Sequence, residues 1–377
     1  MSVYICGFIA SIILLALSDK IVKKQRWGLV VPALLIPCLI AGLRASSIGT
    51  DTEGYLVPMT KAALFADNYK EYMDSSWYRI WRNLFVRDYE YGFSFIVYLF
   101  AKMFKSVVAV QFVVQLLTVL PIYFAACKTK YKTWICMAVY YFIFFNTSLN
   151  MMRQTIAIAF GVLAIQFFIE GKKKSFLVYA FIGFLFHYSS VLIFLIAYIY
   201  KFVQREGKKR KIIGIPLNSY YSNMVFIMFI GLVGLMGIGV IAKLLPYIGL
   251  GRYTNYLIGS EGGIQFLPTQ ILIRLPIFLL CILNWKCMNK NEENFRFYFV
   301  MIFLEMLAAQ LASANTYSGR IAMYFAAFEI FSYASLCSNS KHRYLVRGCT
   351  FAYLFFYWWY FYVLLGRDST IPYLFLQ

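Results

Sequence analysis

The chain has 377 residues, of which 62% are hydrophobic, 20% are aromatic and only 14% are charged. This apolar fraction exceeds that of a soluble domain, and apolar runs near the length of a bilayer crossing recur along the whole chain. The net charge of +20 comes largely from short loops between those runs, which favours a polytopic membrane protein over one that binds nucleic acid.

The cysteines and histidines indicate neither disulfides nor a metal site. Most of the eight cysteines lie in or beside apolar runs, and the sequence contains no Cys-x-x-Cys motif. The two histidines, His187 and His342, are far apart in the sequence, and Asp51 with Glu53 offers only two carboxylates. We therefore predict no metal and no cofactor.

The first apolar runs set the predicted topology. Residues 3–17 are followed by no small-residue cleavage site, so we interpret them as a retained span. The basic loop 20–26 then lies in the cytoplasm, the N-terminus lies outside, and residues 27–43 cross outward. Residues 44–105 follow as a long outer segment rich in Tyr and Trp, in which the short run 92–104 is predicted to be an interfacial helix.

The rest of the chain continues this alternation of spans and basic cytoplasmic loops. Further crossings are predicted at residues 107–126, 134–146, 154–169, 222–244, 267–285, 297–312, 321–337 and 349–365. Residues 176–200 are predicted to form two short helices that break near His187, because a single crossing would place the basic loop 201–211 outside. The predicted fold is an all-α polytopic membrane protein with about 12 transmembrane helices in a single domain (1–377) and both termini outside.

Single arginines stand at the predicted outer ends of separate spans. They are Arg44, Arg153, Arg252 and Arg320. A guanidinium matches phosphate oxygens bidentately and stays charged, so a cluster of arginines would suit a lipid-linked phosphate or pyrophosphate. The alternative is that each arginine reaches an ordinary phospholipid headgroup. Tyr256 follows Arg252 by one helical turn, and Tyr324 follows Arg320 likewise, so each pair would share a helix face.

Other polar residues leave alternatives open. Gly49 permits a sharp turn that would project Asp51 from the outer end of a span, although an ordinary Asx-type turn explains the same residues. His187 suits a general base or a phosphate donor, but a buried histidine bonded to backbone fits equally. Charged residues also lie within predicted spans, where we predict an Arg–Glu ion pair between helices. They are Arg274, Glu305 and Glu329.

Six motifs together resemble the EpsG family of bacterial membrane proteins. They are Arg44-Ala-x-x-x-Gly-Thr-Asp-Thr-x-x-Tyr55, Glu90-x-Gly-Phe93, Arg153-Gln-x-Ile-Ala-x-Ala-Phe160, Phe186-His-x-Ser189, Arg252-Tyr-x-x-Tyr256 and Arg320-x-x-x-Tyr-Phe325. The combination and its order are fairly specific, whereas each motif alone is weak. The residues after Gly366 contribute nothing to the resemblance.

The resemblance implies a polymerase, similar in role to Wzy, that joins oligosaccharide repeat units of exopolysaccharide, capsule or O-antigen outside the cytoplasmic membrane. Its substrates would be glycans on undecaprenyl pyrophosphate, and its partners would be the bilayer, a Wzz-like chain-length regulator and a Wzx-like flippase. We expect Asp51 to be the base for the acceptor hydroxyl, with His187 and Glu90 as the other candidates. The predicted pyrophosphate-binding residues are Arg44, Thr50, Tyr55, Arg153, Gln154, Arg252, Tyr253, Tyr256, Arg320 and Tyr324.

Two other functions fit parts of the sequence. A membrane O-acyltransferase with a catalytic His187 would not need four outer arginines. A flippase or transporter of the lipid-linked oligosaccharide would use charges deep in a central cavity and duplicated halves, and the sequence shows no internal repeat.

Overall fold

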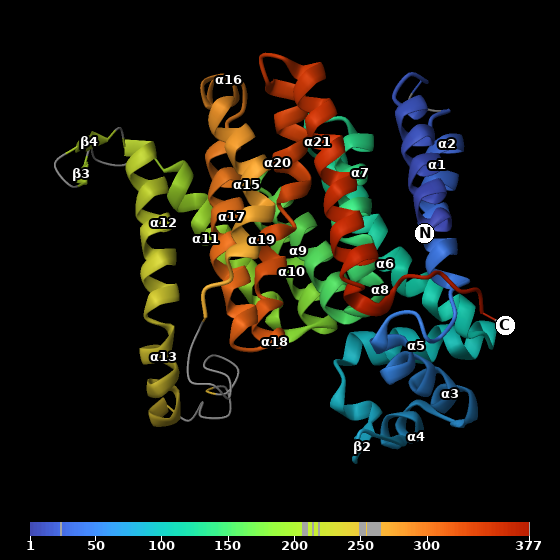
Figure 1. Cartoon of the computed structure of the whole chain (residues 1–377). Coiled ribbons are helices and arrows are strands. Elements are labelled where there is room, and N and C mark those ends of the chain that lie inside the picture. The colour runs from blue at the N-terminus through green and yellow to red at the C-terminus, as the bar shows by residue number, and fades with distance from the viewer. Residues whose placement is uncertain are drawn as a thin grey trace. The chain divides into compact units, whose positions relative to one another are not determined.

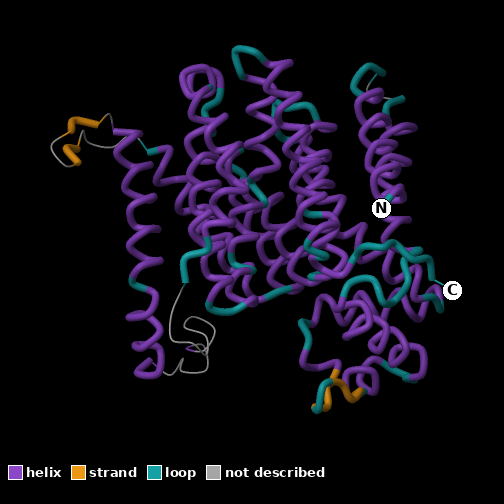
Figure 2. The backbone as a smooth tube through the Cα atoms, viewed as in Figure 1, coloured by secondary structure: helices purple, strands orange, loops and turns teal. Residues whose placement is uncertain are grey.

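The computed structural model describes residues 1–22, 25–205, 210–212, 215–217, 219–248, 254 and 265–376. Almost all regular structure in these residues is helical, which confirms the predicted all-α class (Figures 1 and 2). Contacts divide the chain into two compact units: unit 1 is Met1–Val191 with Leu354–Gln377, and unit 2 is Leu192–Tyr353. The single transmembrane domain expected from the sequence stays a prediction.

Unit 1 contains ten α-helices before the chain enters unit 2, and the end of α21. The α-helices are α1 (Ser2–Ser18), α2 (Trp27–Gly42), α3 (Val57–Phe65), α4 (Tyr69–Asp74), α5 (Tyr91–Phe104), α6 (Val107–Cys127), α7 (Thr133–Ile143), α8 (Phe145–Asn150), α9 (Met152–Ile169) and α10 (Lys173–Phe186). The shorter elements are the π-helical turns η1 (Thr52–Leu56) and η7 (Trp359–Leu364), the 3-10 turns η2 (Val86–Asp88), η3 (Tyr188–Val191) and η8 (Arg367–Ser369), and strands β1 (Ser76–Arg79) and β2 (Arg82–Phe85).

Unit 2 is also helical in its described residues. Its α-helices are α11 (Leu192–Gln204), α12 (Ser219–Met236), α13 (Ile238–Leu244), α15 (Pro268–Leu283), α16 (Trp285–Asn291), α17 (Phe295–Ala308), α18 (Thr316–Gly319), α19 (Ala322–Ala326), α20 (Glu329–Asn339) and α21 (Arg343–Trp358), which continues into unit 1. The remaining elements are β3 (Arg210–Ile212), β4 (Ile215–Leu217), η4 (Leu245–Ile248) and η6 (Ala309–Ser313).

Helix length supports a membrane protein but not the expected number of crossings. Among the described residues, three helices are long and apolar enough to span a bilayer: α6, α9, and α17 together with η6. The pair α15 and α16, bent by 69°, would be a fourth if it forms one span. Several other predicted spans, such as 3–17, 27–43 and 134–146, correspond to shorter apolar helices, so the count of about 12 is not confirmed.

The chain breaks at His187, as the basic-loop argument predicts. Helix α10 ends there because His187 adopts extended backbone angles (φ −161°, ψ 124°). The 3-10 turn η3 follows, and α11 begins at Leu192. The break leaves the imidazole at a helix end rather than on a helix face, which frees it to contact residues outside its own helix.

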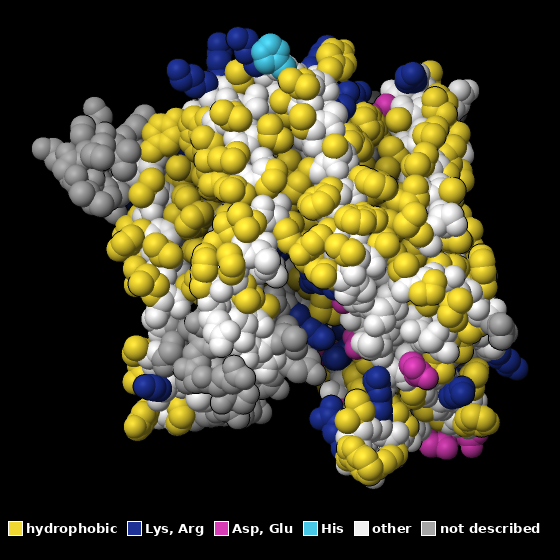
Figure 3. All heavy atoms as spheres, in the orientation of Figure 1, with side chains coloured by type: hydrophobic (Ala, Val, Ile, Leu, Met, Phe, Trp, Pro, Cys, Tyr) yellow, Lys and Arg dark blue, Asp and Glu magenta, His cyan; other side chains and the backbone are white. Residues whose placement is uncertain are grey.

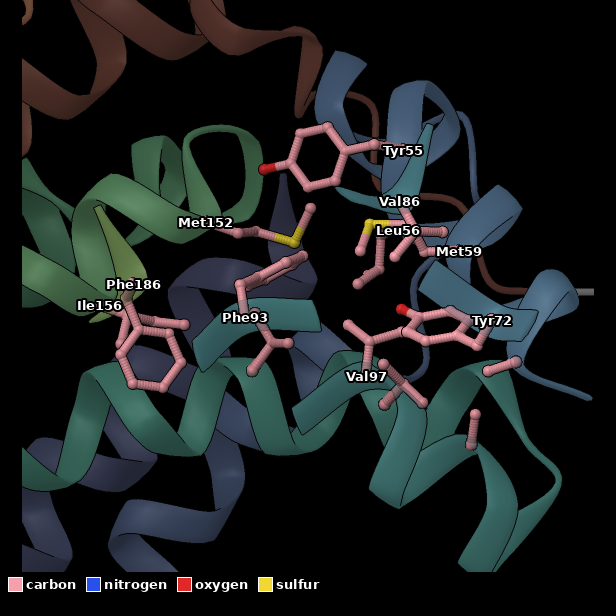
Figure 4. Packing of buried hydrophobic residues seen from close by; sticks show 14 of the residues in the cluster. Tyr55, Leu56, Met59, Tyr72, Val86, Phe93, Val97, Met152, Ile156 and Phe186 are labelled. Carbon is pink, nitrogen blue, oxygen red and sulfur yellow. The ribbon is translucent and has the colours of Figure 1, made fainter. Parts of the chain in front are cut away.

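A buried hydrophobic cluster connects residues 44–105, the predicted outer segment, to the long helices of unit 1. Phe93 and Val97 on α5 pack with Tyr72 on α4 and with Ile156 on α9 (Figure 4). Burying a side chain such as Phe93 contributes about 2 kcal/mol to stability. A helix, α5, is therefore present where the interfacial helix was predicted, and one of its faces packs on protein; its place at the membrane interface stays a prediction.

Strands β1 and β2 form a hairpin that the sequence does not predict (orange in Figure 2). Its two turn residues, Ile80 and Trp81, both have positive φ angles of 48° and 64°. Such turns normally use Asn or Gly, which is why this sequence gives no hairpin signal. Arg79 and Arg82 pair directly across the strands next to the turn.

The C-terminal segment pairs with the chain that follows α2. The backbone N–H of Ala45 donates to the carbonyl of Leu374 (2.8 Å), and that of Leu376 donates to Leu43 (2.9 Å). The segment after Gly366, which carries none of the sequence motifs, therefore has a structural role in unit 1.

Unit 2 contains the ion pair predicted between helices. Arg274 on α15 lies 2.5 Å from Glu305 on α17, and both side chains are buried. This confirms the Arg–Glu pair and accounts for two charges within apolar helices. In Figure 3, hydrophobic side chains cover the middle of the visible helices of unit 2, and Lys and Arg gather at the end where α16 and the loop between α20 and α21 lie.

Candidate functional site

The turn after α2 presents Asp51 just before η1. Gly49 has φ 78°, and a Cβ atom there would lie 2.6 Å from the carbonyl oxygen of Leu149, so only glycine fits. Asn150 fixes the turn, because its Oδ1 accepts hydrogen bonds from the Thr50 hydroxyl (2.8 Å) and the Asp51 backbone N–H (3.2 Å). The Asp51 carboxylate is thus held on a rigid turn.

Two tyrosines connect Asp51 to Arg153 at the start of α9. The Tyr55 hydroxyl donates to Asp51 Oδ2 at 2.9 Å. The Arg153 guanidinium lies 5.0 Å from the ring centre of Tyr55 and 4.8 Å from that of Tyr89. Cation–π contacts of this kind orient a guanidinium without neutralising it. Arg153 therefore keeps its charge beside the Asp51 turn.

Glu90, at the start of α5, is buried between two basic side chains. One carboxylate oxygen pairs with Arg153, and the other lies 2.6 Å from Nδ1 of His187. Burial alone would raise the pKa of Glu90, but the hydrogen bond from His187 and the charge of Arg153 outweigh it and lower the pKa to about 2. Glu90 is therefore an ionised acceptor at neutral pH and a poor general base.

The Glu90 carboxylate fixes the tautomer of His187. Because an ionised carboxylate only accepts, Nδ1 must carry the hydrogen, and in the neutral imidazole Nε2 is left with a lone pair. Within the described part of the chain Nε2 makes no hydrogen bond, and the side chain is 28% exposed. This is the arrangement of a general base that a second residue orients.

Five predicted site residues therefore form one connected cluster, which we call the polar array. Its members are Asp51, Tyr55, Glu90, Arg153 and His187. The array joins the outer segment to the start of α9 and the end of α10, all within unit 1. It combines a cation that can bind phosphate with an imidazole that can accept a proton.

Arg79 and Arg82 on the hairpin add positive charge to the array. Burial raises the pKa of Tyr89, whereas the charges of Arg153, Arg82 and Arg79 lower it. Arg79 also donates to the backbone carbonyl of Thr50 (3.3 Å). The hairpin thus places two further cations where they act on Tyr89, the ring that Arg153 contacts.

Arg44 lies away from solvent rather than in an open cavity. Its side chain is only 1% exposed and donates to the carbonyls of Ala41 and Leu149 (the latter at 3.4 Å) and to the Thr52 hydroxyl (3.1 Å). These contacts favour a role in holding the turn that carries Asp51. Binding of pyrophosphate by Arg44 stays a prediction.

For the remaining predicted site residues, a place in the polar array stays a prediction. Gln154 is buried on α9 beside Arg153. Arg320 and the buried Tyr324 belong to unit 2. Arg252, Tyr253 and Tyr256 lie outside the described residues. Convergence of all four arginines on one pocket therefore stays a prediction.

Asn150 and Asp368 support the site and were not among the predicted residues. Asn150 holds both Thr50 and Asp51, and its own Nδ2 donates to Asp368 Oδ1 (2.9 Å). No local sequence signal marks either residue, because their contact joins positions 218 residues apart. Among the described residues no group of three His, Cys, Asp or Glu side chains is placed to hold a metal ion.

Comparison with known proteins gives one match. The model of the EpsG family matches residues 27–375, nearly the whole chain and every residue of the polar array. No curated protein and no solved structure matches.

Proposed function

The chain belongs to the EpsG family, and we propose that it polymerises lipid-linked oligosaccharide repeat units at the outer face of the cytoplasmic membrane. The proposed substrates are glycans carried on undecaprenyl pyrophosphate, for exopolysaccharide, capsule or O-antigen. The observation that carries the proposal is the contact of Glu90 with both Arg153 and His187. Arg153, which we propose binds phosphate, and His187, which we propose accepts the proton, each contact one oxygen of the same carboxylate.

In the proposed reaction, a hydroxyl oxygen of the acceptor sugar attacks the anomeric carbon of the donor glycan. A new glycosidic bond forms while the bond from that carbon to the pyrophosphate oxygen breaks. The pyrophosphate leaves with the bonding electrons on its lipid, and His187 Nε2 takes the hydroxyl proton. The lipid pyrophosphate is itself the activated donor, so the step needs no nucleotide.

The basic residues of the array would stabilise the departing pyrophosphate. Arg153 is 24% exposed, and two tyrosine rings hold its guanidinium in place. A preorganised cation contributes most where negative charge develops in the transition state, because it need not reorganise during the reaction. Arg79 and Arg82 would contribute to the same field. Asp51, which accepts from Tyr55, remains the second candidate for the base.

Deleting the gene in the producing bacterium and resolving its glycan on a gel tests the proposed function. We expect single repeat units without a ladder of longer chains, and restoration of the ladder by the wild-type gene. Full-length polymer with altered acylation would instead identify an O-acyltransferase. Repeat units trapped on the cytoplasmic side would identify a flippase.

Thiol labelling tests the proposed orientation. In a variant without the eight native cysteines, a cysteine replacing the exposed Lys70 on α4 should react with a membrane-impermeant maleimide in intact cells. A cysteine replacing the exposed Lys341 should react only after the cells are permeabilised. The opposite labelling pattern would contradict an outer location of the polar array.

A further inference from the structure

A pocket of about 600 Å³ lies in the outer segment, beside the polar array. It is lined by Ser46 in the turn after α2 and by residues in or next to η1, α3, α4 and β1, so it belongs entirely to unit 1. Its volume falls within the roughly 300–1,000 Å³ typical of small-molecule sites. The reaction proposed above uses none of the side chains that line it.

Two aromatic side chains line the pocket, and one of them is rigidly held. The Trp77 indole N–H donates to the carbonyl of Gly54 (3.1 Å), and its ring stacks on Tyr89 with centroids 5.8 Å apart. Phe65 also lines the pocket and is 84% exposed, although it is an apolar side chain. Aromatic rings suit the apolar C–H face of a sugar ring, and that of Trp77 is already fixed in place.

Two charged side chains in the pocket are available to a ligand. Glu53 and Lys61 both line it, and both are exposed. Neither makes a hydrogen bond or ion pair within the described part of the chain. A carboxylate accepts hydrogen bonds from hydroxyl groups, and an ammonium group donates hydrogen bonds to them. Together, Glu53 and Lys61 can therefore use both the donor and the acceptor capacity of sugar hydroxyls.

The same residues argue against a phosphate ligand. A second carboxylate, Glu71, lines the pocket with Glu53, and like charges would repel a pyrophosphate. Serine hydroxyls, including Ser46 and Ser75, also line it, which disfavours a purely apolar ligand such as the lipid chain. The ligand class that fits these residues is therefore uncharged and rich in hydroxyl groups, with apolar ring faces.

Trp77 links the pocket to the polar array. Its stacking partner Tyr89 is the ring that Arg153 contacts at 4.8 Å, and Glu53 follows Asp51 by two residues on the same turn. We propose that this pocket is a saccharide subsite. It would hold sugar rings of the repeat unit while the reacting end of that unit lies at the polar array. The proposal rests on the proposed function and adds the residues that would recognise the glycan.

Binding of the free glycan to the purified full-length protein tests the subsite. The probe is the repeat-unit oligosaccharide released by mild acid from the lipid carriers of a deletion strain, titrated by ligand-observed NMR. We expect Glu53→Gln and Lys61→Met each to weaken its affinity about tenfold, the effect of losing one hydrogen bond to a charged group. The matched controls Asp67→Asn and Lys70→Met, exposed in the same segment but outside the pocket, should bind like wild type.

Polymerisation kinetics separate this proposal from the proposed function. If the subsite is correct, the two pocket variants raise KM and leave kcat near the wild-type value. Equal affinity in all variants, or no binding of the oligosaccharide to a wild-type protein that polymerises, would overturn the subsite and leave the function standing. A wild-type protein that binds the glycan through these residues but does not polymerise would instead overturn the function alone.

Discussion

Arg153→Lys is expected to lower polymer formation about 100-fold while the protein still folds. Lysine keeps the positive charge that the buried Glu90 requires, but it loses the planar guanidinium that contacts Tyr55 and Tyr89 and that matches phosphate oxygens. The expected size follows from removing one well-placed donor at a site of developing negative charge. The measurement is the ladder of chain lengths at matched protein levels.

The control for this prediction is Arg87→Lys. Arg87 also pairs with a carboxylate, that of Asp74 at 3.3 Å, but both side chains are largely exposed and lie outside the polar array. Exposed pairs of this kind contribute little, so the control should make normal polymer. Arg153→Ala is a poorer test, because it leaves Glu90 buried without its cation and would destabilise the fold by about 3–5 kcal/mol. A normal ladder from Arg153→Lys would contradict the assigned role.

His187→Gln is expected to lower kcat about 100- to 10,000-fold, the range for loss of a general base. Glu90→Gln should lower kcat with little change in KM, because the neutral amide of glutamine no longer fixes the tautomer of His187 as the carboxylate does. Since the two residues act as one unit, the double variant should lose no more than His187→Gln alone. His342→Gln, which changes the exposed histidine of unit 2, is the matched control.

Asp51→Asn distinguishes the two candidates for the base. If His187 is the base, Asp51→Asn should retain more activity than His187→Gln, because it mainly weakens the hydrogen bond from Tyr55. If Asp51→Asn is inactive while His187→Gln still extends chains, Asp51 is the base. For the earlier pair of variants, a double variant whose loss of kcat equals the combined losses of Glu90→Gln and His187→Gln would show that Glu90 and His187 do not act as one unit.

The sequence predicted the longer apolar helices, because each is an apolar run, but it did not predict short polar helices such as α4 and α16. The break at His187 was also predictable, since the predicted cytoplasmic location of the following basic loop requires a break there. The number of crossings was not, because several apolar runs form helices too short to be recognised as spans by length. Whether a short helix crosses depends on its neighbours rather than on its own residues.

The members of the polar array were predictable one by one, but their contacts were not. Glu90 pairs with residues that lie 63 and 97 positions further along the chain. A single sequence shows no signal for contacts at such separations. The β1–β2 hairpin was hidden for a different reason, because its turn uses Ile80 and Trp81 where a glycine or asparagine would have marked it.

Arg44 makes contacts that its position in the sequence did not indicate. Its place at the end of an apolar run suggests a headgroup or phosphate ligand. In the structure the guanidinium donates to the carbonyls of Ala41 and Leu149, where two chain segments meet, and binding of a phosphate stays a prediction. Buried carbonyls need donors, and a long basic side chain supplies several at once.

Reconstituted polymerisation is the most direct test that the polar array is the catalytic site. The purified protein in lipid nanodiscs would be given lipid-linked repeat units, and chain length and released undecaprenyl pyrophosphate would be followed together. We predict that wild type extends chains with one pyrophosphate lipid released per bond formed, and that His187→Gln and Arg153→Lys bind the units but extend them at least about 100-fold more slowly. Chain extension at the wild-type rate by both variants would contradict the account.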